Sequence, residues 1–207
     1  MRTTLPLLAL LGLLSLAAAS PLPAPALEDG LGKALQNRQT IRNFTGKPLP
    51  AQQLSQLLWA AYGVNRPDGK LTVPAALNRH AFSLYVLTQD GASLYLPKEH
   101  RLDQVSPKNL LPLADGSGRL GPAAGTAILL VGNAKVFDDL GATPEKAAFY
   151  LGVEAGAICQ DIYLYCAAQG LGTVCCGSLQ ADALAKALQL PQGQVPFLTM
   201  VVGFPAR

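Results

Sequence analysis

Histidine and charged residues are scarce in this chain, and their scarcity excludes several classes of function. Only His80 and His100 occur among the 207 residues, so a histidine-rich metal site is excluded and a Ser-His-Asp triad has few candidates. Charged residues make up 14% of the chain, its net charge is +3, and Lys and Arg form no run, so nucleic-acid binding is not indicated. Half of the residues are hydrophobic, which argues against disorder and predicts a folded domain with a real core.

Recognised cysteine motifs are also missing. The four cysteines do not have the spacing of a zinc ribbon or of a CxxC redox motif. Cys159 and Cys166 are separated by two helical turns, which would place their Cα atoms about 10 Å apart, too far for a disulfide within one helix. An oxidising compartment would permit other pairings. The alternative is that most of these cysteines are small buried side chains near a packed site, and the sequence leaves the pairing open.

The first 26 residues predict a signal peptide and a Pro-rich leader rather than a part of the fold. Arg2 precedes an apolar run from Leu5 to Ala19, which is too short for a confident membrane span and is typical of a secretory signal. Two positions fit the rule for cleavage after small residues, namely Ala19 and Ala26. We therefore expect an exported protein, in the bacterial periplasm, with no stable membrane span after cleavage and one domain over residues 27–207. A retained N-terminal anchor helix is the alternative.

The hydrophobic pattern predicts helices and strands in irregular order. Expected helices are 28–37, one from Pro50 to Gly63, 143–172 and 179–190, and the expected strands are a hairpin over 82–96, a buried strand 126–133 and a last strand 197–205. Helix 143–172 is apolar around most of its circumference, which predicts burial in a core or an interface. The segment 113–122 is expected to be a mobile or substrate-facing loop. The absence of repeating βα units favours an α+β fold with helices packing on a central sheet.

Two guanidinium groups and a hydroxyl lie close together in the segment "NRQTIRNF". Arg38, Thr40 and Arg42 fall within five residues. Guanidinium forks bind phosphate oxygens in bidentate fashion, and a hydroxyl can donate a further hydrogen bond. The residues fit a receptor for a phosphate dianion, and they also fit two solvated charges that pair with local acids.

Five blocks in order resemble the nitroreductase-like family of FMN flavoproteins, nearest its SagB-type dehydrogenases. "NRQTIRNF" is similar to the family's opening Arg-x-Ser-x-Arg-x-Phe motif, and "LLWAAYGV…VPAALN" to its second block. "SLYLPKEHRL" resembles a hairpin of that subgroup, "GLGTVCCGSL" a loop that contacts the flavin, and "VVGFP" the closing strand. The resemblance, which runs from about Gly32 to the end of the chain, implies α/β/α layers around a mostly antiparallel sheet.

The resemblance also implies FMN as cofactor, a homodimer with FMN at the interface, and a small-molecule substrate. No metal ligand and no certain catalytic side chain is implied; the flavin N5 would be supported by the backbone of Cys175, Cys176 and Gly177. The phosphate and ribityl chain would lie on the first motif, and the second block would approach from the other subunit. The implied cofactor-binding residues are Arg38, Gln39, Thr40, Arg42, Pro74, Ala75, Ala76, Asn78, Val174, Cys175, Cys176, Gly177 and Arg207.

Some positions depart from the family pattern. Ala75 replaces the usual Ser, Arg119 is the only basic candidate before the central strand, and the C-terminal extension of many relatives is missing. His80 and Tyr85 are candidates for substrate-side groups, with a packed or surface role as the alternative for each. No G-x-G-x-x-G follows a strand, and export would remove the chain from reduced pyridine nucleotides, so we expect a different electron donor.

The expected activity is an FMN-dependent oxidoreductase that transfers hydride at flavin N5 by a ping-pong mechanism. One alternative is a flavin-binding or electron-relay protein without catalysis. Another is an exported binding protein that has lost the cofactor. Bound flavin on purification and steady-state turnover distinguish the three.

Overall fold

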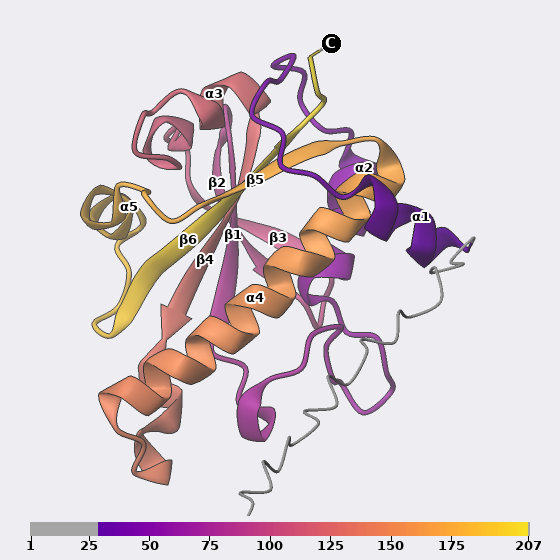
Figure 1. Cartoon of the computed structure of the whole chain (residues 1–207). Coiled ribbons are helices and arrows are strands. Elements are labelled where there is room, and N and C mark those ends of the chain that lie inside the picture. Colours follow the sequence, from indigo (N-terminus) through magenta and orange to yellow (C-terminus); the bar gives the residue numbers. More distant parts are fainter. Residues whose placement is uncertain (1–28, 207) are drawn as a thin grey trace, which may run out of the picture.

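The computed structural model describes residues 29–206, so the predicted leader over 1–26 and Arg207 lie outside the described residues. Six strands form one sheet in the order β3-β2-β1-β4-β6-β5, and every neighbouring pair is antiparallel. Their bounds are Phe82–Thr88 for β1, Gly91–Leu96 for β2, Arg101–Ser106 for β3, Thr126–Asn133 for β4, Gly172–Cys176 for β5 and Gln194–Gly203 for β6. Helices cover both faces of this sheet, which gives the expected α/β/α layers (Figure 1).

The pleat of the central strands divides the core into two clusters. In β4, Ile128 and Leu130 face one side, whereas Leu129 and Val131 face the other, and all four are fully or almost fully buried. Successive side chains of a strand point to opposite faces, so a strand buried on both faces must be apolar at every position. This explains the continuous apolar run that predicted β4 over 126–133.

One face of the sheet is covered by three helices, α1 (Gly30–Asn37), α2 (Ala51–Tyr62) and α4 (Pro144–Gln169). The long helix α4 crosses the sheet obliquely (Figure 1). It begins where the Thr143 side chain accepts a hydrogen bond from the Lys146 N–H at 3.3 Å, and it ends at Gly170, whose φ of 68° is left-handed. Both ends follow the N-cap and C-cap signals in the sequence.

The opposite face carries shorter elements. They are the 3-10 turn η2 (Leu111–Leu113) and the helices α3 (Leu120–Ala124) and α5 (Ala181–Leu188). Leu111 and Leu184 anchor them in the second core cluster. Two further 3-10 turns connect helices with strands: η1 (Ala76–Asn78) lies between α2 and β1, and η3 (Ala134–Leu140) lies between β4 and α4. Among residues 29–206, no helix is long and apolar enough to span a membrane.

The α+β fold and the principal elements are confirmed, with two differences. Strand β3 was not predicted, because its sequence "RLDQVS" is mostly polar and exposed on the edge of the sheet. Val174, Cys175 and Cys176 belong to strand β5 rather than to the loop that the resemblance implied. The expected loop within 113–122 is present over 114–119, between the end of η2 and the start of α3, and the buried Asp115 organises it.

Candidate functional site

The predicted phosphate motif lies along the outer edge of β5. The Ile41 N–H donates a hydrogen bond to the Thr173 carbonyl at 3.0 Å, and Phe44 forms a β-bridge with Pro205. The motif is therefore held between an edge strand and the C-terminal segment of the chain. Arg38 ends helix α1, and its N–H donates to the Ala34 carbonyl, so the motif leaves a helix and enters an extended segment with fixed direction.

The hydroxyl of Tyr163, on helix α4, connects the motif to the end of β5. It accepts the N–H of Cys175 at 3.2 Å and lies 3.1 Å from the Thr40 hydroxyl. The guanidinium of Arg38 lies over the Tyr163 ring, 5.3 Å from its centroid, in a cation–π arrangement. Either hydroxyl of the Thr40–Tyr163 pair can donate the proton, because a hydroxyl oxygen that accepts from the Cys175 N–H can still accept a second hydrogen bond.

A cavity of about 440 Å³ opens beside this junction, between the segment 36–39, the last turns of α4 and Pro205. Arg38 and Gln39 line it together with Tyr163. The last carbonyl groups of a helix carry partial negative charge, which disfavours a bound anion. The positive charges of Arg38 and Arg42 at this end of the molecule oppose that effect.

The charges of Arg42 and Asp115 shift the pKa of Cys176, which lies at the end of β5. Burial raises the pKa of the Cys176 thiol, the charges of Asp115 and Cys175 raise it further, and hydrogen bonding with Thr199 and the charge of Arg42 lower it. Asp115 accepts the backbone N–H groups of Ser117, Leu120 and Gly121 at 2.9, 3.0 and 3.2 Å. Burial would raise the pKa of Asp115, but hydrogen bonds from the Ser117 hydroxyl and from the N–H groups of Gly121, Ser117 and Arg119 outweigh it and lower the pKa.

The loop that Asp115 organises packs against the segment after β5. A Cβ atom at Gly116 would lie 2.7 Å from the Ser178 carbonyl oxygen, and the Gln180 N–H donates to the Leu113 carbonyl at 3.0 Å. Gly177 itself is open, because a Cβ there would meet no atom of the chain within 4 Å. The exposed Arg119 is on the same loop. The structure thus brings Arg38, Thr40, Arg42, Cys175, Cys176 and Gly177 to one end of the molecule.

The other predicted block, which comprises Pro74, Ala75, Ala76 and Asn78, is elsewhere in the chain. It forms the turn η1, in which Leu77 and Asn78 have left-handed φ angles of 54° and 57°. Such angles are strained for residues other than glycine and persist only where the surroundings impose them. Glu154 of α4 binds the segment that follows this turn, at His80 and Ala81. It lies nine positions before Tyr163, which is about 14 Å along the helix axis.

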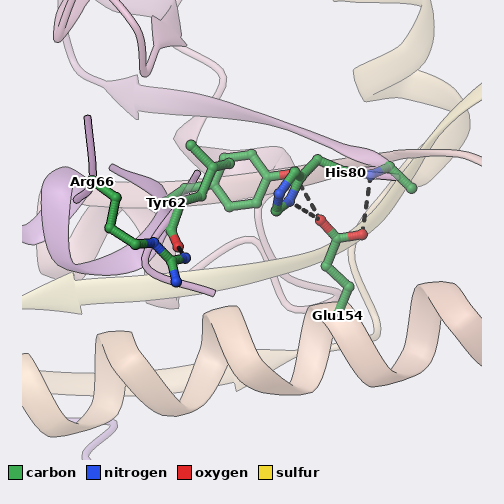
Figure 2. A network of polar contacts seen from close by, with 6 residues as sticks. Tyr62, Arg66, His80 and Glu154 are labelled. Atoms are coloured by element: carbon green, nitrogen blue, oxygen red, sulfur yellow. Dashed lines mark hydrogen bonds and ion pairs between the residues drawn. The ribbon is translucent and has the colours of Figure 1, made fainter. Parts of the chain in front are cut away.

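Figure 2 shows Tyr62 and His80 directed at Glu154, which projects from α4. One carboxylate oxygen of Glu154 accepts a hydrogen bond from the Tyr62 hydroxyl at 2.8 Å and lies 3.3 Å from His80 Nδ1. The other oxygen accepts a hydrogen bond from the Ala81 N–H at 3.0 Å. Glu154 is only 1% exposed, and burial together with its charge raises the pKa of Tyr62 far above the ordinary value. Arg66, at the edge of the same view, donates to the Leu71 carbonyl.

Several side chains therefore have roles that differ from those expected. His80 directs Nδ1 at Glu154 and supports the η1 turn, and Tyr85 is buried in the second core cluster, so neither points to an open substrate site. Sequence analysis assigned no role to Tyr163 or to Glu154. Glu154 was the one detectable signal, since a charge on a helix that is apolar all round requires a buried partner.

Comparison with known proteins gives consistent matches. The model of the nitroreductase family matches residues 35–204. A proposed nitroreductase of Methanocaldococcus jannaschii is 29% identical over 190 residues, which cover 86% of this chain and 90% of that protein. The crystal structure of a proposed nitroreductase of Ralstonia eutropha JMP134 has a TM-score of 0.79 at 31% identity, over 90% of this chain and 89% of that chain.

A more distant structure shows the fold alone. The NADPH:FMN oxidoreductase of Vibrio harveyi, solved in complex with NAD+, has a TM-score of 0.64 at 19% identity, over 86% of this chain and 70% of that chain.

We predict that Glu154→Ala destabilises the protein by about 3–5 kcal/mol. The change leaves the Tyr62 hydroxyl and the Ala81 N–H buried without an acceptor, and each such group costs about 1–3 kcal/mol. Glu154→Gln keeps one oxygen acceptor and should cost less. Urea denaturation measures both, with the exposed Glu99→Ala as control. Equal stability of Glu154→Ala and the wild type would show that the carboxylate does not hold the turn.

Proposed function

The chain belongs to the nitroreductase family and is therefore an oxidoreductase of that family, and we propose that it is FMN-dependent. The observation that supports FMN is the convergence of Arg38, Thr40 and Arg42 with the open Gly177 at one end of β5. When bound, FMN supplies two-electron chemistry at its N5 atom, with donor and substrate reacting in turn in a ping-pong cycle. The blocks that resemble SagB-type dehydrogenases favour an organic small molecule as substrate.

The described residues fit the phosphate end of such a cofactor. Arg38 and Arg42 supply two guanidinium groups, and the Thr40 hydroxyl is held beside the Tyr163 hydroxyl, which is itself bonded to the Cys175 N–H. Charge-assisted hydrogen bonds to phosphate are stronger than neutral ones. These groups would bind and orient the FMN phosphate, and Gln39, which lines the adjoining cavity, would contact the ribityl chain.

The end of β5 fits the edge of the flavin ring. Among the three backbone donors proposed for N5, the Cys175 N–H is already bound to the Tyr163 hydroxyl. Gly177 lies just beyond the strand and has open space where a side chain would be. A glycine at such a position permits a flat ring to approach the backbone closely. We therefore assign the N5 contact to Gly177, with Cys176 beside it.

We also propose a homodimer with a cofactor site at its interface. Phe149 and Val153 of α4 are 60% and 54% exposed, and they lie on one helical face because they are four residues apart. Gly152 precedes Val153 and Gly156 follows it, and no atom of the chain lies within 4 Å of the position that a side chain would take at either glycine. A second helix could therefore approach α4 closely here. Glu154, which binds the segment just after the η1 turn, lies about 14 Å along α4 from Tyr163. The turn is therefore separated from the phosphate motif of its own subunit, and we propose that its residues Pro74 to Asn78 contact the cofactor of the partner subunit.

Purified protein should carry bound FMN and should turn over with a donor and an acceptor. Losing one charge-assisted hydrogen bond to phosphate costs about 1.5–3 kcal/mol, so Arg42→Ala should weaken FMN binding at least about tenfold. Fluorescence titration of the apoprotein with FMN measures this. The matched control is Arg101→Ala, because Arg101 is an exposed arginine on β3 that pairs with Asp103.

The outcomes of these measurements separate the alternatives. Bound FMN without turnover for any donor and acceptor pair would favour a flavin-binding or electron-relay protein. Absence of any flavin absorption band, together with no binding of added FMN, would contradict the proposal. Unchanged affinity in Arg42→Ala would remove the phosphate assignment alone.

The dimer is expected to persist at micromolar concentration, with an interface of more than roughly 2,000 Å². Replacing Val153 by Asp would bury a carboxylate in this interface and should yield monomers that retain little FMN. Light scattering coupled to size exclusion measures the mass. Val195→Asp changes an apolar residue of β6 that is 50% exposed and should leave the dimer intact. A wild-type monomer loaded with flavin would refute the proposed interface.

A further inference from the structure

The side chain of Cys175 faces helix α4, whereas that of its neighbour Cys176 does not. Val174 and Cys176 both belong to the second core cluster, on the face of α5 and η2. Because side chains alternate along a strand, Cys175 points to the other face, on which α4 lies. The N–H of Cys175 donates to the Tyr163 hydroxyl of α4, which fixes the distance between strand and helix at this residue.

Helix α4 presents a second thiol at the same place. Cys159 precedes Tyr163 by four residues and so lies on the same helical face, one turn earlier. The two thiols lie close enough for each to shift the pKa of the other. The other two thiols are placed differently, because Cys176 belongs to the opposite core cluster and Cys166 is fully buried two turns further along α4.

The two paired thiols have unequal environments. Cys175 is exposed, whereas Cys159 is 9% exposed. Hydrogen bonding with Cys159 lowers the pKa of Cys175 to about 7 against the opposing effect of burial. The same hydrogen bond and burial raise the pKa of Cys159. A thiolate is the attacking species in thiol chemistry, so only Cys175 is prepared to attack near neutral pH.

The charged and titratable groups around the pair are few among the described residues. Tyr163 contacts Cys175 from α4, and Arg38 lies over the Tyr163 ring from the first motif. Cys176 follows along the strand and is itself affected by Asp115 and Arg42.

We propose that Cys159 and Cys175 form a redox-active dithiol that exchanges with an external disulfide. The Cys175 thiolate attacks one sulfur of the external disulfide, forms a mixed disulfide and releases the first thiolate. Cys159 then gives up its proton and attacks the Cys175 sulfur, which releases the second thiolate. The two cysteines are oxidised to an intramolecular disulfide, and the external disulfide is reduced to two thiols after uptake of two protons.

The ligand class is therefore a disulfide of small thiols or of an exposed peptide. The inference goes beyond the proposed flavin chemistry and does not depend on it, because it requires only the two thiols and the external disulfide. Flavin content and thiol exchange are separate measurements, so either proposal can fail without the other.

The direct test treats the purified, reduced protein with glutathione disulfide at pH 7.5 and measures intact mass. The wild type should lose two hydrogen atoms, and peptide mapping without reductant should join the peptides of Cys159 and Cys175. Cys159→Ala should instead accumulate the mass of one glutathione on Cys175, and Cys175→Ser should remain unmodified. Cys166→Ala is the matched control on the same helix and should form the disulfide as the wild type does.

A second measurement follows the rate of Cys175 alkylation by iodoacetamide against pH. The wild type should have a midpoint near 7, and Cys159→Ala should shift it upward toward about 8.5, the value of a free thiol. Cys166→Ala should not shift it. A wild-type protein that stops at the glutathione adduct, or that joins a different pair of cysteines, would overturn the proposal. The wild-type measurement needs no variant, so it remains decisive even if a variant fails to fold.

Discussion

The packing of helix α4 against the sheet is the constraint on which the other features depend. Ile158 and Ile162 are fully buried in the first core cluster, and each such side chain contributes about 1.5–3 kcal/mol on burial. The helix therefore cannot rotate or slide without exposing a row of apolar side chains. Because it is one rigid element, it fixes the positions of Glu154, Cys159 and Tyr163 relative to each other. Glu154 binds the segment after the η1 turn, Cys159 belongs to the thiol pair, and Tyr163 contacts Thr40 of the phosphate motif.

Much of the fold was predictable because its signals are local. Thr143 and Gly170 delimit α4, Gly63 ends α2, and the apolar run of β4 requires burial on both faces. Strand β3 escaped prediction because an exposed edge strand has no apolar alternation to detect. The contacts of Tyr163 with Thr40 and Cys175 were beyond sequence reasoning, since they join residues 123 and 12 positions apart, and no local pattern specifies such pairs.

The sequence names candidate residues for the site, whose role stays a prediction, and only the structure gives their arrangement. Arg38, Thr40 and Arg42 were identified from guanidinium chemistry and from the resemblance, whereas their relation to α4 came only from the structure. The cavity lined by Arg38 and Tyr163 is at the carbonyl end of α4, where an anion is disfavoured. The positive charge of Arg38, which lines this cavity, opposes that effect.

The segment that carries Arg38 and Arg42 also covers the exposed edge of the sheet. Strand β5 is the last strand in the order, and an uncovered edge strand offers unpaired backbone groups to other chains. The segment that carries the arginines covers this edge through the hydrogen bond from Ile41 to Thr173, and Tyr163 binds the backbone of Cys175 from the helix side. Edge protection and placement of the phosphate motif are therefore one structural feature. A change that frees the segment from β5 would expose the edge and displace both guanidinium groups together, so it would affect stability and the proposed phosphate site at once.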